Sequence, residues 1–134
     1  MELIVLKGVP NAGKTATINY VYNELKDKRG YILHRHQKFR KGDFLAVVKK
    51  ENDIVGIISQ GEGIPYIKKF LKEFKDQEGC TKVICAQRKD SNTKTDLFKN
   101  YFILKSIDIQ EIGEINQKVE EILALVCSTP YTPN

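Results

Sequence analysis

The sequence predicts an α/β protein, a three-layer α/β/α sandwich with about five strands that are mostly parallel and an antiparallel hairpin at one edge. Three observations predict it. The apolar run at residues 3–6 leads through a glycine-containing loop into a helical pattern, strand-like and helix-like segments alternate afterwards, and two β-rich runs flank a polar turn. The length of 134 residues suits one domain. We expect that domain at residues 1–127 and a flexible tail at residues 128–134.

The first strand and the first helix are the clearest elements. Residues 2–7 have the composition of a short buried strand. After the loop, apolar side chains recur at the helical spacing i, i+3, i+4 and i+7, at positions Ile18, Val21, Tyr22 and Leu25. Gly30 follows a run of basic residues, which is the usual end of a helix.

The loop between these elements, residues 8–15, matches the pattern G-x-x-x-x-G-K-[ST]. Gly8 and Gly13 let the backbone turn tightly, so that several N–H groups and the helix dipole face one anion. Lys14 is long enough to reach β- and γ-phosphate oxygens and is a catalytic candidate, while the Thr15 hydroxyl is placed to ligate Mg²⁺. The predicted nucleotide-binding residues are Gly8, Val9, Pro10, Asn11, Ala12, Gly13, Lys14, Thr15 and Ala16.

This motif resembles that of the P-loop containing nucleoside triphosphate hydrolase superfamily, although the matching residues cover only the first two dozen positions. The resemblance implies the P-loop NTPase fold for the whole chain, with ATP or GTP as the ligand and Mg²⁺ as the cofactor. A glycine-containing turn in another α/β fold is the alternative.

Residues 31–43 form a basic segment with two interpretations. It carries a cluster of basic or titratable side chains, among them His34, Arg35, His36, Lys38 and Arg40. In P-loop kinases the segment after the first helix often receives the phosphoryl acceptor, so the resemblance makes these five residues a possible site for a phosphorylated small-molecule acceptor. The alternative is a solvated connection.

Residues 44–49 and 54–59 should form the hairpin, with the first run at the sheet edge and the second beside the first strand. That pairing is similar to the GTPase-like branch of the superfamily and gives the strand order 2-3-1-4-5. By the same resemblance, an Asp that holds Mg²⁺ through water is expected where the second run ends. This chain has Ser59 there, and its next carboxylate is Glu62. We predict Ser59 in the metal sphere and Glu62 as the residue that positions the nucleophile, or else as part of a simple turn.

The second half of the chain supplies a helix with a buried stripe from Ile67 to Phe74, a strand at residues 82–86, a strand at residues 103–109 and a closing helix. Arg88, just after the strand at residues 82–86, stands where α/β sheets bind ligands. It is either a charge-stabilising arginine like those of nucleotide kinases, which we prefer, or part of a degraded guanine-reading N-K-x-D motif that retains only Asp90.

The composition limits the possible functions. The net charge is +5, which favours anionic partners and is explained by nucleotide binding. Three cysteines without C-x-x-C spacing indicate free thiols, and neither a leader nor an apolar run long enough for a membrane is visible, so we expect a cytoplasmic location. The sequence thus predicts a Mg²⁺-dependent, ATP-binding P-loop protein that transfers a phosphoryl group, as a small kinase-like enzyme would, or hydrolyses NTP slowly. A GTPase-like, nucleotide-gated interaction module is the alternative, and a nucleic-acid-binding ATPase is the least favoured.

Overall fold

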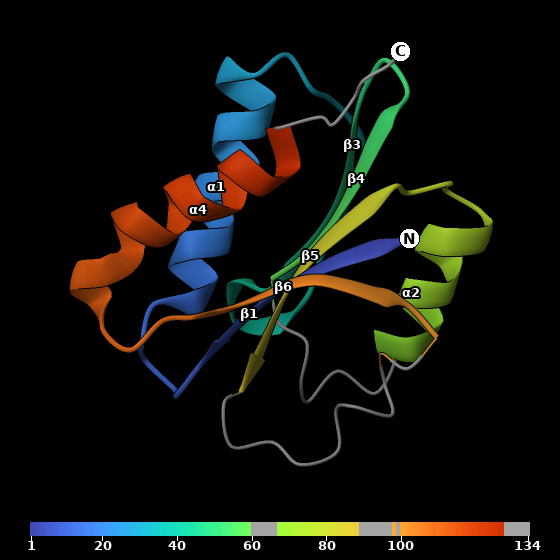
Figure 1. Ribbon diagram of the computed structural model, residues 1–134. Coiled ribbons are helices and arrows are strands. Elements are labelled where there is room, and N and C mark those ends of the chain that lie inside the picture. The colour runs from blue at the N-terminus through green and yellow to red at the C-terminus, as the bar shows by residue number, and fades with distance from the viewer. Residues whose placement is uncertain (60–66, 89–97, 99, 128–134) are drawn as a thin grey trace.

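The structure, a computed structural model, describes residues 1–59, 67–88, 98 and 100–127 (Figure 1). Residues 128–134, predicted to be a tail, lie outside this part. The elements in chain order are β1 (Glu2–Gly8), α1 (Lys14–Lys28), β2 (Ile32–Lys38), the 3-10 turn η1 (Arg40–Gly42), β3 (Phe44–Lys50), β4 (Asp53–Ile58), α2 (Ile67–Asp76), β5 (Lys82–Arg88), β6 (Phe102–Asp108), the 3-10 turn η2 (Ile112–Glu114) and α4 (Ile115–Cys127).

The strands form one mixed sheet of six strands in the order β2-β3-β4-β5-β1-β6. The strand β3 is antiparallel to both of its neighbours, and the pairs β4–β5, β5–β1 and β1–β6 are parallel. The α/β class and the antiparallel hairpin are therefore confirmed. The five-strand count and the order 2-3-1-4-5 are wrong, because β5 lies between β4 and β1. The GTPase-like pairing of β4 with the first strand is absent.

The strand β2 is the element that the sequence did not reveal. It lies at the sheet edge, where all of its residues except Arg35 are exposed, so it lacks the apolar alternation that marks a half-buried strand. Its pairing with β3 also shifts by one residue between Leu33 and Arg35. Because β2 occupies the edge, β3 is an interior strand, with residues Phe44 to Val48 buried.

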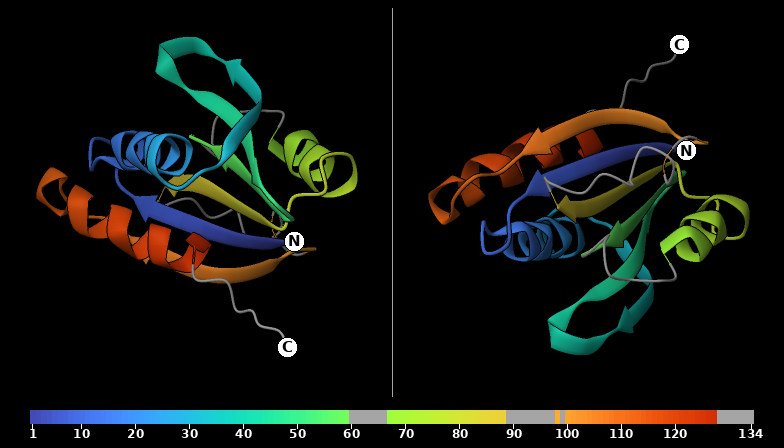
Figure 2. Two further views of the ribbon diagram at one scale, coloured as in Figure 1. Left: turned by 90° about the horizontal axis from the view of Figure 1, so that it is seen from above. Right: turned by 90° about the horizontal axis from the view of Figure 1, so that it is seen from below.

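Helices cover both faces of the sheet: α1 and α4 lie side by side on one face, and α2 lies on the other (Figures 1 and 2). Alternation along β1 divides the core accordingly. Ile4 and Leu6 pack with the α1 and α4 side chains, and Leu3 and Val5 pack with α2. Each such side chain is fully buried or nearly so and contributes roughly 1.5–3 kcal/mol by leaving water.

The helix α1 ends where the sequence predicts, just before Gly30. The helix ends at Lys28, and Gly30 follows with a φ of 81°, a left-handed conformation that suits glycine. The backbone N–H groups of Arg29 and Tyr31 donate to the carbonyl oxygens of Glu24 and Leu25, which caps the last turn. None of the described helices is long and apolar enough to cross a bilayer.

The cysteines are free thiols, as expected, but they lie in different environments. Burial is the main cause that raises the pKa of Cys80 and of Cys85 to about 12, whereas Cys127 at the end of α4 is only partly buried. Since the thiolate is the reactive form, the two core thiols should be protected in the folded protein.

We expect a disulfide reagent such as DTNB at pH 8 to modify Cys127 first and to reach Cys80 and Cys85 only at the rate at which the core opens. The substitution Cys127→Ser should remove the fast phase, and denaturant should make every thiol reactive. Rapid labelling of Cys85 in the native protein would contradict the packing of β5 between the two helix layers.

Candidate functional site

The β1–α1 loop, residues 9–13, is closely packed where it begins and where it ends, against Ile109 and Ile115. A Cβ atom added to Gly8 would lie 2.7 Å from the carbonyl oxygen of Ile109, and one added to Gly13 would lie 2.9 Å from the side chain of Ile115. Gly13 also has a φ of 100°, a conformation that L-residues rarely adopt. Both predicted glycines are therefore required by the local geometry.

The N-terminus of α1 is open to an anion. Gly13 is the residue before the first helical turn, and among the described residues no side chain caps the N–H groups that follow it. The first turn also carries no acidic residue. The N–H groups at the start of a helix have no carbonyl partner within the helix, and together with the positive end of the helix dipole they can bind an anion.

Lys14 is folded back over the loop. Its Nζ atom donates a hydrogen bond to the carbonyl oxygen of Gly8 at 2.5 Å and another to that of Val9 at 3.3 Å. The neighbouring Thr15 is exposed, while Thr17 is buried and donates its hydroxyl to the carbonyl oxygen of Gly13 at 2.7 Å. An ammonium group and an exposed threonine thus stand next to each other at the start of the helix.

Arg88 is beside the loop. In the parallel pairing of β1 with β5, Gly8 and Arg88 are register partners, so the arginine stands at the carboxyl end of the neighbouring strand. Its side chain is exposed. This placement is compatible with a charge-stabilising arginine, the role that we preferred from the sequence.

Ser59 is placed differently from what the resemblance implied. It follows β4, which is two strands away from β1, and it is fully buried. Its Oγ atom accepts a hydrogen bond from the backbone N–H of Phe44 at 2.8 Å and donates to Oδ1 of Asp43 at 3.5 Å. The hydroxyl that we predicted for the metal sphere already joins the start of β3 to the end of β4.

Asp43, the last residue of the basic segment, is a partly buried carboxylate that contacts Ser59. The antiparallel direction of β3 brings its first residues to the edge where the parallel strands end. Burial raises the pKa of Asp43, and both the hydrogen bond from Ser59 and the positive charge of Lys41 oppose that rise.

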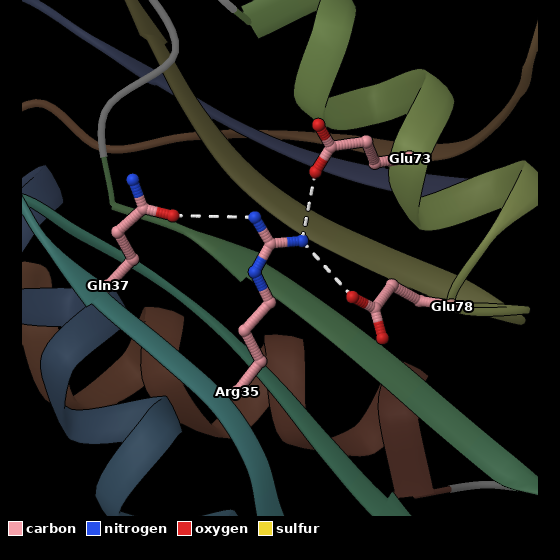
Figure 3. A network of polar contacts seen from close by, with 4 residues as sticks. All are labelled: Arg35, Gln37, Glu73 and Glu78. Atoms are coloured by element: carbon pink, nitrogen blue, oxygen red, sulfur yellow. Dashed lines mark hydrogen bonds and ion pairs between the residues drawn. The ribbon is translucent and has the colours of Figure 1, made fainter.

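The five residues of the possible acceptor site are not gathered at one point. Arg35 turns toward α2 (Figure 3). Its guanidinium forms ion pairs with Glu73 at 3.0 Å and with Glu78 at 3.1 Å, and it donates a hydrogen bond to the side-chain oxygen of Gln37 at 3.3 Å. The ring of His36 turns to the opposite face, where it lies 5.8 Å from that of Tyr22. The remaining members, His34, Lys38 and Arg40, are exposed. The strand β2, which carries most of these residues, lies four strand spacings from β1, a distance of about 19 Å.

Two further candidates, Glu62 and Asp90, lie outside the described residues, so their roles stay predictions. Within the described residues, no three His, Cys, Asp or Glu side chains gather as a metal-binding group.

The glycine geometry predicts that Gly13→Ala lowers the free energy of unfolding by about 2–3 kcal/mol and weakens anion binding at the loop, because strain at positive φ adds to a clash with Ile115. The matched control is Gly42→Ala. Gly42 also has a positive φ, 79°, but no atom of the described residues lies within 4 Å of an added Cβ, so only about 1 kcal/mol should be lost. If urea unfolding showed that both variants lose the same free energy of unfolding, the proposed clash at Gly13 would be contradicted.

The ion pairs of Arg35 predict a mainly structural role. Arg35→Ala should lower the free energy of unfolding by about 1–3 kcal/mol, since it leaves Glu73 and Glu78 close together without their shared cation. The exposed control Lys38→Ala should change it by less than about 0.5 kcal/mol. If Arg35→Ala instead left stability intact and raised the KM for an acceptor, the acceptor interpretation would be favoured.

The chain matches no protein-family model, and comparisons with curated proteins and with solved structures give no significant match. The assignment of function therefore depends on the geometry of the site.

Proposed function

We propose that this chain is a Mg²⁺-dependent, ATP-binding protein with the P-loop NTPase fold, which transfers a phosphoryl group or hydrolyses the nucleotide slowly. The observation that carries the proposal is the β1–α1 loop. A left-handed Gly13, an open helix N-terminus and Lys14 meet at the carboxyl edge of a parallel pair of strands. Each of these features favours a polyphosphate.

Nucleotide binding requires one rearrangement of the described residues. Lys14 exchanges its hydrogen bonds to the carbonyl oxygens of Gly8 and Val9 for bonds to β- and γ-phosphate oxygens. The N–H groups of the first turn of α1 hold the phosphates, and Thr15 is the protein oxygen for the metal ion. When bound, Mg²⁺ supplies charge neutralisation at the phosphates.

The reaction needs stabilisation of the negative charge that develops on the transferred group. Arg88 is suited to this because its position on β5 matches that of Gly8 on β1. Glu62 is proposed to position the nucleophile, which is either water or the hydroxyl of a phosphorylated small-molecule acceptor.

The GTPase-like alternative loses part of its basis. One of its two supports was the expected pairing of β4 with β1, and in the structure β5 lies between these two strands. A preference for GTP over ATP would be the observation in its favour, through base recognition at Asp90.

The direct test is isothermal titration of the protein with ATP and with GTP, each with and without Mg²⁺. We expect Mg²⁺-ATP to bind and Lys14→Ala to weaken binding by about 10- to 100-fold, the effect of losing a charge-assisted hydrogen bond worth about 1.5–3 kcal/mol. The thermal midpoint should stay nearly unchanged.

Lys68→Ala is the control for that titration, because Lys68 is an exposed lysine on α2. It should leave the affinity unchanged. A wild-type protein that binds neither nucleotide, or a Lys14→Ala variant with wild-type affinity, would contradict the proposal.

A further inference from the structure

We propose that the outer edge of β2 is a docking site for an extended, acidic segment of a partner protein, which adds a strand to the sheet. The strand β2 ends the described sheet and has a neighbouring strand, β3, on one side only (Figure 2). An edge strand points some of its N–H and C=O groups away from its neighbour, and an added strand can pair with them. The inference is independent of nucleotide binding, because β2 lies four strand spacings from β1.

The segment at this edge carries positive charge and no negative charge. Residues 32–41 include Arg35, Lys38, Arg40 and Lys41 but no Asp or Glu. The guanidinium of Arg35 is already paired with two glutamates. The other three cations are exposed, one at the end of β2 and two in the turn η1 that follows. An incoming strand meets these three cations, which favour a segment rich in Asp and Glu.

The opposite edge of the sheet lacks this asymmetry. It is formed by β6, whose two charged residues, Lys105 and Asp108, have opposite signs. Lys105 also lies 3.9 Å from a carboxylate oxygen of Glu121. The complementarity to an acidic segment is therefore particular to the β2 edge.

The first residues of β2 offer apolar contacts as well. Ile32 and Leu33 are 68% and 41% exposed. Leu33 is opposite Val48, which packs in the cluster on the α1 face, so alternation turns Ile32 to the other face. An added strand covers both side chains if it has apolar residues at this end. The preferred segment is thus apolar beside Ile32 and Leu33 and acidic beside Lys38 and η1.

A second copy of this chain is a poor occupant of the edge. Antiparallel pairing of two β2 strands centred on Arg35 would place Lys38 of one copy opposite the apolar Ile32 of the other, and neither strand would supply a carboxylate. The pairing of β2 with β3 also shifts between Leu33 and Arg35. Charges and such irregularities are devices that keep edge strands of identical chains apart. The partner must therefore bring its own acidic residues.

Single-stranded nucleic acid is the other polyanion to consider at a basic strand. Its recognition uses exposed aromatic rings on which bases stack. The rings that contact His36 from α1 and β3 are buried, since Tyr22 is 8% and Phe44 is 4% exposed. An open backbone edge with exposed apolar side chains favours a peptide strand instead.

The experiment titrates the protein at pH 7 with end-blocked, fluorescent peptides of about eight residues, enough to span β2. The probe alternates valine and glutamate. One control peptide has lysine in place of glutamate, and the other keeps the glutamates but has proline in place of valine, which removes N–H groups needed for strand pairing. We expect the probe to bind at least about 10-fold more tightly than either control peptide, and less tightly as salt is added.

Variants of the protein locate the binding. Lys38→Glu and Arg40→Glu should each weaken probe binding by about 3- to 10-fold, because each replaces a surface attraction with a repulsion. The matched control Lys105→Glu makes the same charge change on the opposite edge and should alter the affinity by less than about 2-fold. Lys38→Gln serves if the charge reversal disturbs folding. NMR shifts of backbone amides caused by the probe should be largest at residues 32–41.

Three results would overturn the inference. A wild type that binds no probe at up to about 1 mM would exclude docking at this edge. Equal affinity for the valine–glutamate and proline–glutamate peptides, or equal losses in Lys38→Glu and Lys105→Glu, would show that charge alone attracts the probe. Tighter binding of a single-stranded oligothymidylate, lost in Lys38→Glu, would assign the edge to nucleic acid. Each of these results would leave nucleotide binding at the β1–α1 loop standing.

Discussion

The close packing of two glycines against the segment after β6 is the constraint on which the rest of the structure depends. Gly8 and Gly13 leave no room for a Cβ beside Ile109 and Ile115, so the β1–α1 loop, the last strand and α4 are fitted to one another. The backbone N–H of Ile109 donates to the carbonyl oxygen of Lys7 and extends this contact beyond β6. The shape of the loop is thus fixed by the core of the protein and not by local turn preferences alone.

Much of the fold could be predicted from local patterns because its central elements are strongly apolar or strongly periodic. The run at residues 3–6, the hairpin at β3 and β4, and the helices α1, α2 and α4 all carry such a signal. The neighbours of β1 could not be predicted in the same way. Both β4 and β5 are nearly continuous apolar runs, and either composition suits a buried strand beside β1. The strand β2 carries no clear burial signal, since it lies at the edge of the described sheet and most of its residues are exposed.

In the candidate site, too, features that are contiguous in the sequence could be predicted, and contacts between distant residues could not. The loop residues Gly8 to Thr15 are contiguous, so their pattern could be recognised in the sequence. The contact between Ser59 and Asp43 could not be recognised, because the two residues are 16 positions apart in the sequence and meet only through the antiparallel direction of β3. The basic segment looked like one cluster, yet the twofold alternation of a strand turns Arg35 and His36 to opposite faces. Proximity in sequence thus overestimated the possible acceptor site and gave no sign of the partner that Ser59 finds in the fold.

The central claim is that the β1–α1 loop binds the phosphates of a nucleotide, and the most direct measurement is an NMR titration of backbone amide signals with Mg²⁺-ATP. Our account predicts that the largest shifts fall on residues 9–16, with further shifts near Arg88 and little change along the exposed strand β2. The absence of shifts at the loop, or a response centred on β2, would contradict it.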